Sequence, residues 1–151
     1  IPPPAPVYLV RNSIVMKESF DREEWERYLR QGLHTLKSAR GDMEEGDHDW
    51  ACFKAQQAGE LFLKGFLRSI GTIATGHSIT KLLSILKEQN IVIPDKLKRC
   101  GSKLDKVYIP TRYPDAYVWG APVDYYTEED ARESIKCAES ILEFLEGLIN
   151  A

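Results

Sequence analysis

Apolar residues recur at steps of three and four along most of this chain, and this period constrains the fold more than any other feature. The first periodic segment begins at Asp21 and closes near Gly46, with charged residues between its apolar positions. Its stripe consists of Trp25, Leu29, Leu33, Leu36, the stem of Arg40 and Met43. Such spacing is typical of an amphipathic helix with one face on a core.

A second segment, residues 50–70, contains no proline and has apolar residues on more than one side. Asp47 precedes it and is expected to cap the helix by accepting from its free backbone N–H groups. Small residues let neighbouring backbones approach closely, and they recur at Ala51, Ala55, Ala58, Gly59 and Gly65. We expect this helix to be the central one.

Three more helices follow. Ser78 is expected to cap a helix that ends near Asn90, and Pro94 is suited to open a shorter helix. Thr127 and its acidic neighbours predict the start of the last helix. Its apolar stripe is wide enough for both an intramolecular core and a dimer seam, and it comprises Ala131, Ile135, Ala138, Leu142, Leu145 and Ile149, broadened by Cys137, Ile141, Phe144 and Leu148.

The expected fold class is therefore all-α: an up-down antiparallel bundle of four main helices plus a short extra helix. Residues 91–93 could form a strand, but no second β-rich run exists to pair with them.

We assign residues 16–151 to this domain. Residues 1–15 are proline-rich and expected to be extended. They are either a native arm that packs on a neighbour or an addition before a natural start at Met16.

Composition narrows the function classes. A net charge of −3 means that the chain as a whole lacks the positive charge typical of nucleic-acid-binding proteins, so we expect no DNA binding. Any RNA binding would have to use a local basic patch. No apolar run is long enough to span a bilayer, and no signal peptide is visible, which favours a cytoplasmic protein.

The chain has three cysteines, an odd number, and they lie far apart at Cys52, Cys100 and Cys137. They are expected to be reduced, buried and free of zinc.

The segment from Tyr108 to Tyr126 has no helical or strand period and separates the last two helices. A connection of this length inside a compact domain is uncommon and often functional. It carries five tyrosines and a tryptophan, together with Arg112 and Asp115. Flat faces beside a fixed cation suit a planar ligand that carries phosphate. Equally, the tyrosines could seal the open end of the bundle, with Asp115 pairing Arg112.

Several of these pieces together resemble the HEPN domains, which are small all-α proteins of prokaryotes. The resemblance rests on AQQAGELFLKGFL from Ala55 to Leu67, on GHSITKLL from Gly76 to Leu83, and on Arg112-Tyr113-Pro114-Asp115 before a Thr-Glu-Glu helix start. It covers roughly residues 20–148. It implies a homodimer, an association with nucleotides or RNA, and a minimal nucleotidyltransferase as partner in a toxin–antitoxin-like pair.

The nuclease branch of that family places an arginine, then after four to six residues a histidine, near the C-terminal helix. This chain has no histidine after His77, and its Arg27 and His34 lie on the first helix, which is the wrong element. We therefore favour a non-cleaving member and assign no catalytic residue. The alternatives are a metal-independent ribonuclease with a rearranged site and a helical scaffold for protein contacts.

The candidate ligand-binding residues are Lys64, His77, Arg112, Tyr113, Asp115 and Tyr117, with Glu60 in support. Arg112 would grip a phosphate, and Tyr113 or Tyr117 would stack a base. His77 could hold a phosphate at a helix start or simply fix the turn. Glu60 and Lys64, four residues apart, would form an ordinary surface pair in most proteins. If they are buried they must be paired, and Glu60 could then hold Arg112 or His77 in place.

No metal ion or other cofactor is expected. The acidic cluster Glu44, Glu45, Asp47, His48 and Asp49 lacks the glycine and the spaced ligands of a calcium loop. We interpret it as a solvated helix junction. Nor does the chain contain a nucleophile elbow or a phosphate-binding glycine loop after a strand.

Overall fold

The computed structural model describes residues 19–150, and within that range the fold is all-α, with no strand. The prediction for residues 1–15 lies outside the described part. The elements are α2 (Arg22–Glu44), α3 (His48–Ser69), α4 (Ile79–Glu88), α5 (Asp95–Lys106), the 3-10 turns η1 (Pro114–Ala116) and η2 (Pro122–Asp124), and α6 (Glu128–Ile149). The predicted helical bundle is confirmed. Two of its helices are short, since α4 has 10 residues and α5 has 12.

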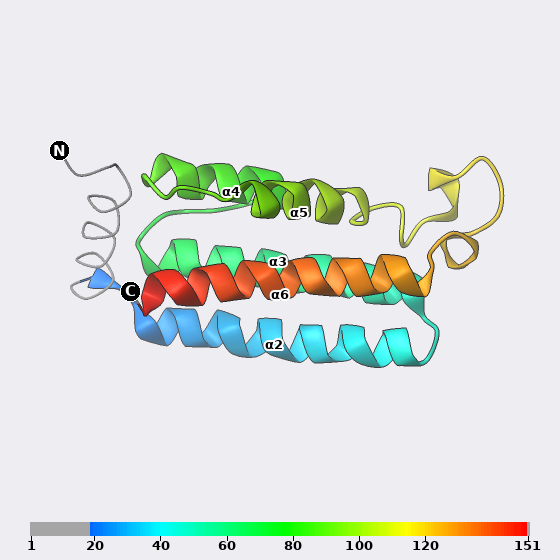
Figure 1. Cartoon of the computed structure of the whole chain (residues 1–151), viewed down its shortest axis with the longest axis horizontal. Coiled ribbons are helices and arrows are strands. Elements are labelled where there is room, and N and C mark those ends of the chain that lie inside the picture. The colour runs from blue at the N-terminus through cyan, green and yellow to red at the C-terminus, as the bar shows by residue number, and fades with distance from the viewer. Residues whose placement is uncertain (1–18, 151) are drawn as a thin grey trace.

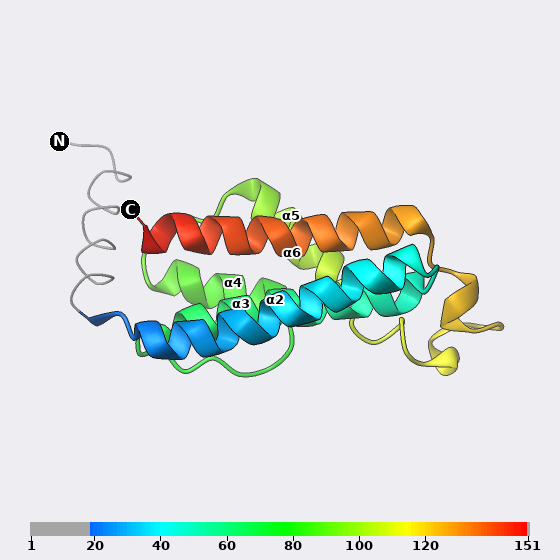
Figure 2. The same ribbon diagram turned by 90° about the horizontal axis from the view of Figure 1, so that it is seen from below.

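The helices form a layered bundle. Figure 1 shows α4 and α5 lying together on one side of α3 and α6, with α2 on the other side. The turned view in Figure 2 shows α6 beside α5, and α2 crossing over α3. The segment between α5 and α6 projects beyond one end of the bundle, where α2 passes into α3. This segment is the aromatic loop predicted from the sequence.

The central position of α3 is confirmed. It packs against α2, α4, α5 and α6, and its large side chains Phe62, Leu63, Phe66 and Leu67 are fully buried. Small residues on α3 allow the close approach: a Cβ at Gly65 would collide with the Cβ of Tyr28 on α2. In α2 the apolar stripe is incomplete, because Leu33 is 44% exposed.

Side chains cap most helix starts as expected. The Ser78 hydroxyl accepts from the Lys81 N–H (3.1 Å), and Thr127 begins α6 with a reciprocal capping box with Asp130. The prediction for Asp47 was wrong in part: it occupies the N-cap position of α3, but its side chain makes no capping hydrogen bond.

One capping contact was not foreseen from the sequence. The Asp105 carboxylate on α5 accepts from the Ser78 hydroxyl (2.9 Å) and from the Ile79 N–H (2.6 Å). A carboxylate at a helix N-terminus satisfies orphan donors and complements the helix dipole. Asp105 therefore fixes the start of α4, and with it the loop just before, which carries His77.

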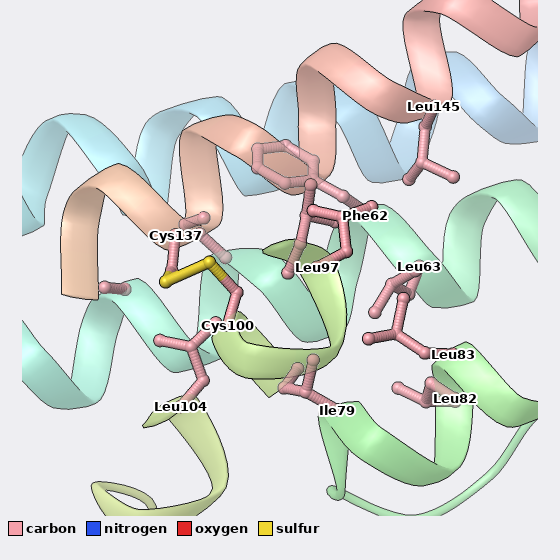
Figure 3. Close-up of a cluster of buried hydrophobic side chains, with 14 of the residues drawn as sticks. Phe62, Leu63, Ile79, Leu82, Leu83, Leu97, Cys100, Leu104, Cys137 and Leu145 are labelled. Atoms are coloured by element: carbon pink, nitrogen blue, oxygen red, sulfur yellow. A yellow bond between two sulfur atoms is a disulfide. The ribbon is translucent and has the colours of Figure 1, made fainter. Parts of the chain in front are cut away.

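All three cysteines are buried as expected, but the expectation that all are reduced was wrong. Cys100 on α5 and Cys137 on α6 form a disulfide, with their Cα atoms 5.2 Å apart, and only Cys52 is free. Figure 3 shows this bond at the edge of the buried cluster, close to Leu97 and Leu104. Their separation of 37 residues carries no signal of pairing. The pairing arises because α5 and α6 pack side by side and both cysteines lie on the contact face.

No helix in the described range is long and apolar enough to cross a membrane.

Candidate functional site

A buried carboxylate on α3 lies at the centre of the polar residues predicted for the site. Glu60 is 8% exposed. It forms an ion pair with Lys64 one turn later (2.8 Å), and it accepts from the side-chain amide of Gln56 one turn earlier (3.2 Å). The prediction that a buried Glu60 must be paired is confirmed.

Another partner of Glu60 is His77. The Nδ1 atom of His77 lies 3.1 Å from one Glu60 oxygen and 3.2 Å from the other. Fully buried Gln56 also donates to the backbone carbonyl of His77 (2.8 Å), which ties the loop before α4 to α3. Because Nδ1 faces a carboxylate, it carries the proton in the neutral ring and leaves Nε2 as an acceptor. More than half of the His77 side chain is exposed to solvent.

Tyr108, at the start of the aromatic loop, joins His77 to Arg112. Its ring stacks on the imidazole of His77 with centroids 4.9 Å apart and planes 21° apart. The Arg112 guanidinium lies over the same tyrosine ring (4.7 Å), and also over Phe53 (4.3 Å) and Tyr113 (5.0 Å). Two of its N–H groups donate to the Tyr108 carbonyl, at 3.0 and 2.8 Å.

We call the residues Glu60, Lys64, His77, Tyr108, Arg112 and Tyr113 the His77–Arg112 cluster. Three parts of the chain build it: α3, the loop before α4, and the start of the aromatic loop up to Tyr113, just before η1. Sequence reasoning overlooked Tyr108, Phe53 and Gln56, which hold the cluster together. A signal was available for two of them, since Tyr108 is one turn before Arg112 and Gln56 is one turn before Glu60.

The remaining two candidates lie elsewhere in the loop. Tyr117 stacks on Tyr125, with centroids 4.1 Å apart, and donates from its hydroxyl to the hydroxyl of Tyr126 (2.8 Å). One face of Tyr117 is therefore already covered. Asp115 is exposed, and the predicted ion pair with Arg112 is absent among the described residues.

The tip of the loop presents apolar side chains to solvent. Val118 is fully exposed, Trp119 is 77% exposed and Val123 is 64% exposed. The backbone beneath them is ordered by local bonds, such as that from the Tyr125 hydroxyl to the Trp119 carbonyl (2.7 Å). Exposed apolar side chains gathered in one loop make this tip a candidate surface for contacts with another molecule.

Other clusters of titratable groups offer no site. Within the described residues, no group of three or more His, Cys, Asp or Glu side chains is arranged to hold a metal ion. Burial raises the pKa of the free Cys52 thiol to about 11. It therefore stays protonated at neutral pH and is a poor nucleophile. Burial likewise raises the pKa of Tyr126, and its contact with Tyr117 contributes.

Fold and site together define a small helical-bundle domain with one charged and aromatic surface. The chain belongs to the HEPN domain family, whose model matches residues 25–148.

Solved structures and a curated protein are similar to this chain. TT1696 from Thermus thermophilus is 44% identical with a TM-score of 0.79, and the match covers 82% of this chain and 97% of that one. ST0689, an archaeal HEPN homologue, is 41% identical with a TM-score of 0.70, covering 83% and 97%. A protein of Methanocaldococcus jannaschii named "Putative toxin MJ1304" is 24% identical over 131 residues, which is 81% of this chain and 86% of that protein.

Proposed function

We propose that this chain is a nucleotide- or RNA-binding HEPN module that also binds a protein partner, in a toxin–antitoxin-like pair. One observation carries the ligand half of the proposal. Arg112 is packed against three aromatic rings and held by a backbone carbonyl, yet within the described residues no carboxylate pairs with it. A guanidinium that is rigid and uncompensated is well prepared to receive an anion.

The free donors of Arg112 fit a phosphate. A guanidinium has five N–H groups in a fixed fork. The Tyr108 carbonyl takes one from Nε and one from Nη2, and Nη1 has only a long contact of 3.5 Å to the Tyr113 hydroxyl. The N–H groups of Nη1 are therefore free to donate to phosphate oxygens, and such charged hydrogen bonds are about twice as strong as neutral ones.

Neighbouring residues extend this ligand chemistry. Tyr113 is 47% exposed, so one of its faces is available to stack a base. The Nε2 edge of His77 points away from Glu60 and can bond a ribose hydroxyl or a phosphate oxygen. Lys64 is occupied by Glu60, and its role in the proposal is to neutralise that buried carboxylate next to an anionic ligand.

The partner half rests on the exposed loop tip and on the relatives. Val118 and Trp119 offer an apolar patch for a protein surface. The similarity to a protein named as a toxin, together with family membership, supports pairing with a small nucleotidyltransferase as the neutralising protein. Homodimerisation also belongs to the proposal. Leu142 and Phe144 on α6 are only partly buried, so they could contact a second copy of the chain.

Replacing Arg112 and Tyr113 together by alanine is expected to weaken the binding of AMP, ATP and a short single-stranded RNA by at least about tenfold. The reason is the loss of a charged hydrogen bond, worth roughly 1.5–3 kcal/mol, together with a stacking face. Isothermal titration calorimetry measures the affinities, and circular dichroism confirms that the helices remain.

The matched control is Arg132→Ala, which removes an exposed arginine from α6 whose ion-pair partners in the described part of the chain are Glu128 and Glu129. It should bind like the wild type. Absence of binding by the folded wild type would refute the ligand half. Loss of a partner in the Arg112 and Tyr113 variant, with ligand binding unchanged, would instead support the scaffold alternative.

A second candidate function is metal-independent RNA cleavage, favoured by the contact between Glu60 and His77. A carboxylate that orients a histidine leaves Nε2 as a general base, and Arg112 in the same cluster could stabilise a charged transition state. If this function holds, His77→Ala should abolish cleavage of a labelled RNA while reducing its binding only a few-fold. RNA that binds the wild type and stays intact would exclude it.

A further inference from the structure

Acidic residues gather at one end of the bundle. Two segments form this end: residues 41–53, where α2 passes into α3, and residues 107–131, which contain the aromatic loop and the start of α6 (Figures 1 and 2). Together they hold ten acidic residues and one basic residue, Arg112. The whole chain has 23 acidic and 20 basic residues, so the remainder carries more basic than acidic side chains. We call the two segments the acidic end.

Basic residues that border the acidic end neutralise only part of its charge. Lys54 pairs with Asp42 (2.8 Å), and Arg132 pairs with Glu128 (2.6 Å) and Glu129 (3.0 Å). Within the described residues no cation pairs with five exposed carboxylates of this end, those of Glu44, Glu45, Asp47, Asp115 and Asp124. The acidic end therefore presents negative charge to solvent.

The acidic end also carries most of the exposed apolar surface. Of the ten large hydrophobic side chains that are exposed in the described part of the chain, seven belong to these two segments. They include Val118, Trp119 and Val123 at the tip of the aromatic loop, and Trp50 at the start of α3. Tryptophan and tyrosine are enriched among the few residues that dominate the energy of protein interfaces. Charge and apolar surface thus coincide at one end of the molecule.

The tip of the aromatic loop is ordered before any partner arrives. The Ala121 N–H donates to the Asp124 carboxylate (3.0 Å), in addition to the bond from the Tyr125 hydroxyl to the Trp119 carbonyl. The turn η2 packs against α3, and its Pro122 is buried. A surface that is already ordered loses little conformational entropy on binding, so more of the contact energy appears as affinity.

The charge of the acidic end decides which kind of partner fits it. A nucleic acid or a membrane of anionic lipids would be repelled by the unpaired carboxylates, and so would the acidic end of a second copy of this chain. A protein surface whose lysines and arginines surround an apolar pocket would match both the carboxylates and the exposed apolar side chains. Among these partners, only the basic protein gains from every feature of the acidic end.

We propose that the acidic end docks a partner protein with a basic surface, in which an apolar pocket receives Trp119. The inference rests on the partner half of the proposed function and adds the chemistry of the partner. Opposite charges accelerate the encounter, and the burial of Val118 and Trp119 slows dissociation. The ligand half depends on Arg112 and Tyr113, so the two halves can be tested separately.

The probe is a displayed library of a small helical domain with one randomised face, selected for binding to the wild-type protein at about 150 mM salt. The tip variant, Val118→Ser with Trp119→Ser, removes two exposed apolar side chains from the loop. Its matched control is Val92→Ser with Ile73→Ser, because these two side chains are also exposed but lie outside the acidic end.

A second pair of variants tests the charge. The acid variant is Glu44→Gln, Glu45→Gln and Asp124→Asn, which keeps the size of each side chain and an acceptor for the Ala121 N–H. Its control removes three exposed acidic residues outside the acidic end and therefore has the same net charge: Glu23→Gln, Glu26→Gln and Glu146→Gln.

The selected domains are expected to be rich in lysine and arginine beside apolar residues on the randomised face. The tip variant should bind them at least about tenfold more weakly than the wild type. The acid variant should associate about three- to tenfold more slowly at about 50 mM salt, and this difference should vanish near 1 M salt, where the Debye length is about 3 Å. Both controls should behave like the wild type.

Selected domains without an excess of basic residues, or an affinity that the tip variant leaves unchanged, would overturn the inference. It would also be wrong if light scattering showed that the wild type forms a dimer which the tip variant dissolves, because a second copy would then cover the tip. Titration with AMP separates the two halves of the proposed function. A wild type that binds basic domains through its tip but binds no AMP would refute the ligand half and leave this inference standing.

Discussion

Reduction of the Cys100–Cys137 disulfide is expected to lower the free energy of unfolding by about 4 kcal/mol. The bond closes a loop of 37 residues. In the chain-entropy model, a cross-link of that length removes conformational freedom from the unfolded state equivalent to about 4 kcal/mol at 25 °C. Because a domain of this size has only about 5–15 kcal/mol of stability, the change should be large in any unfolding experiment.

Urea unfolding with and without a reductant measures this effect. The control is the double variant Cys100→Ser and Cys137→Ser, whose stability should match the reduced wild type and should not respond to the reductant. Alkylation of the unfolded protein checks the bond itself, with one reactive thiol before reduction and three after it. Three reactive thiols before reduction, in protein purified without reductant, would contradict the disulfide.

The second large effect concerns two helical glycines, for which the same substitution should act in opposite directions. Gly65→Ala is expected to destabilise the fold by about 1–3 kcal/mol, the usual range for overpacking. Its new methyl would meet the Cβ of Tyr28, with Cγ of that ring 2.9 Å away. A Cβ cannot rotate out of the way, so α2 itself would have to move from α3.

Gly41→Ala on α2 is the matched control. A Cβ at Gly41 meets nothing within 4 Å, and alanine in a helix is favoured over glycine by about 0.5–1 kcal/mol. We therefore expect a small gain in stability. Chemical denaturation of both variants decides the matter: equal shifts of the same sign would show that helix propensity, and not the approach of α2 to α3, dominates at Gly65.

The fold could be predicted because its signals are local. The three-and-four spacing around Trp25 and Ile135, the cap at Ser78 and the capping box at Thr127 depend only on residues within a few turns of each other. The disulfide and the capping of α4 by the Asp105 carboxylate could not be predicted, since each depends on two elements that meet across the bundle. The spacing of residues along the chain does not indicate which elements contact each other in this way.

In the candidate site, too, local requirements could be predicted from the sequence and contacts between distant residues could not. That a buried Glu60 needs partners follows from electrostatics alone, and the choice of His77 over Arg112 as one of them was open until the loop before α4 was placed. The stack of His77 on Tyr108 joins residues 31 positions apart and has no counterpart in the sequence pattern.

Cytoplasmic localisation stays a prediction, and the disulfide does not exclude it, because disulfides also occur in intracellular proteins of hyperthermophiles.

The disulfide also sets the covalent topology of the aromatic loop. Residues 108–126 lie between Cys100 and Cys137, so the whole loop belongs to a closed ring of main chain and one S–S bond. Val118 in that ring is fully exposed, and we expect a protease to cut at this exposed point of the loop. A cut there would open the ring without releasing a fragment, and α5 and α6 would remain tethered as a two-chain molecule until a reductant reached the bond.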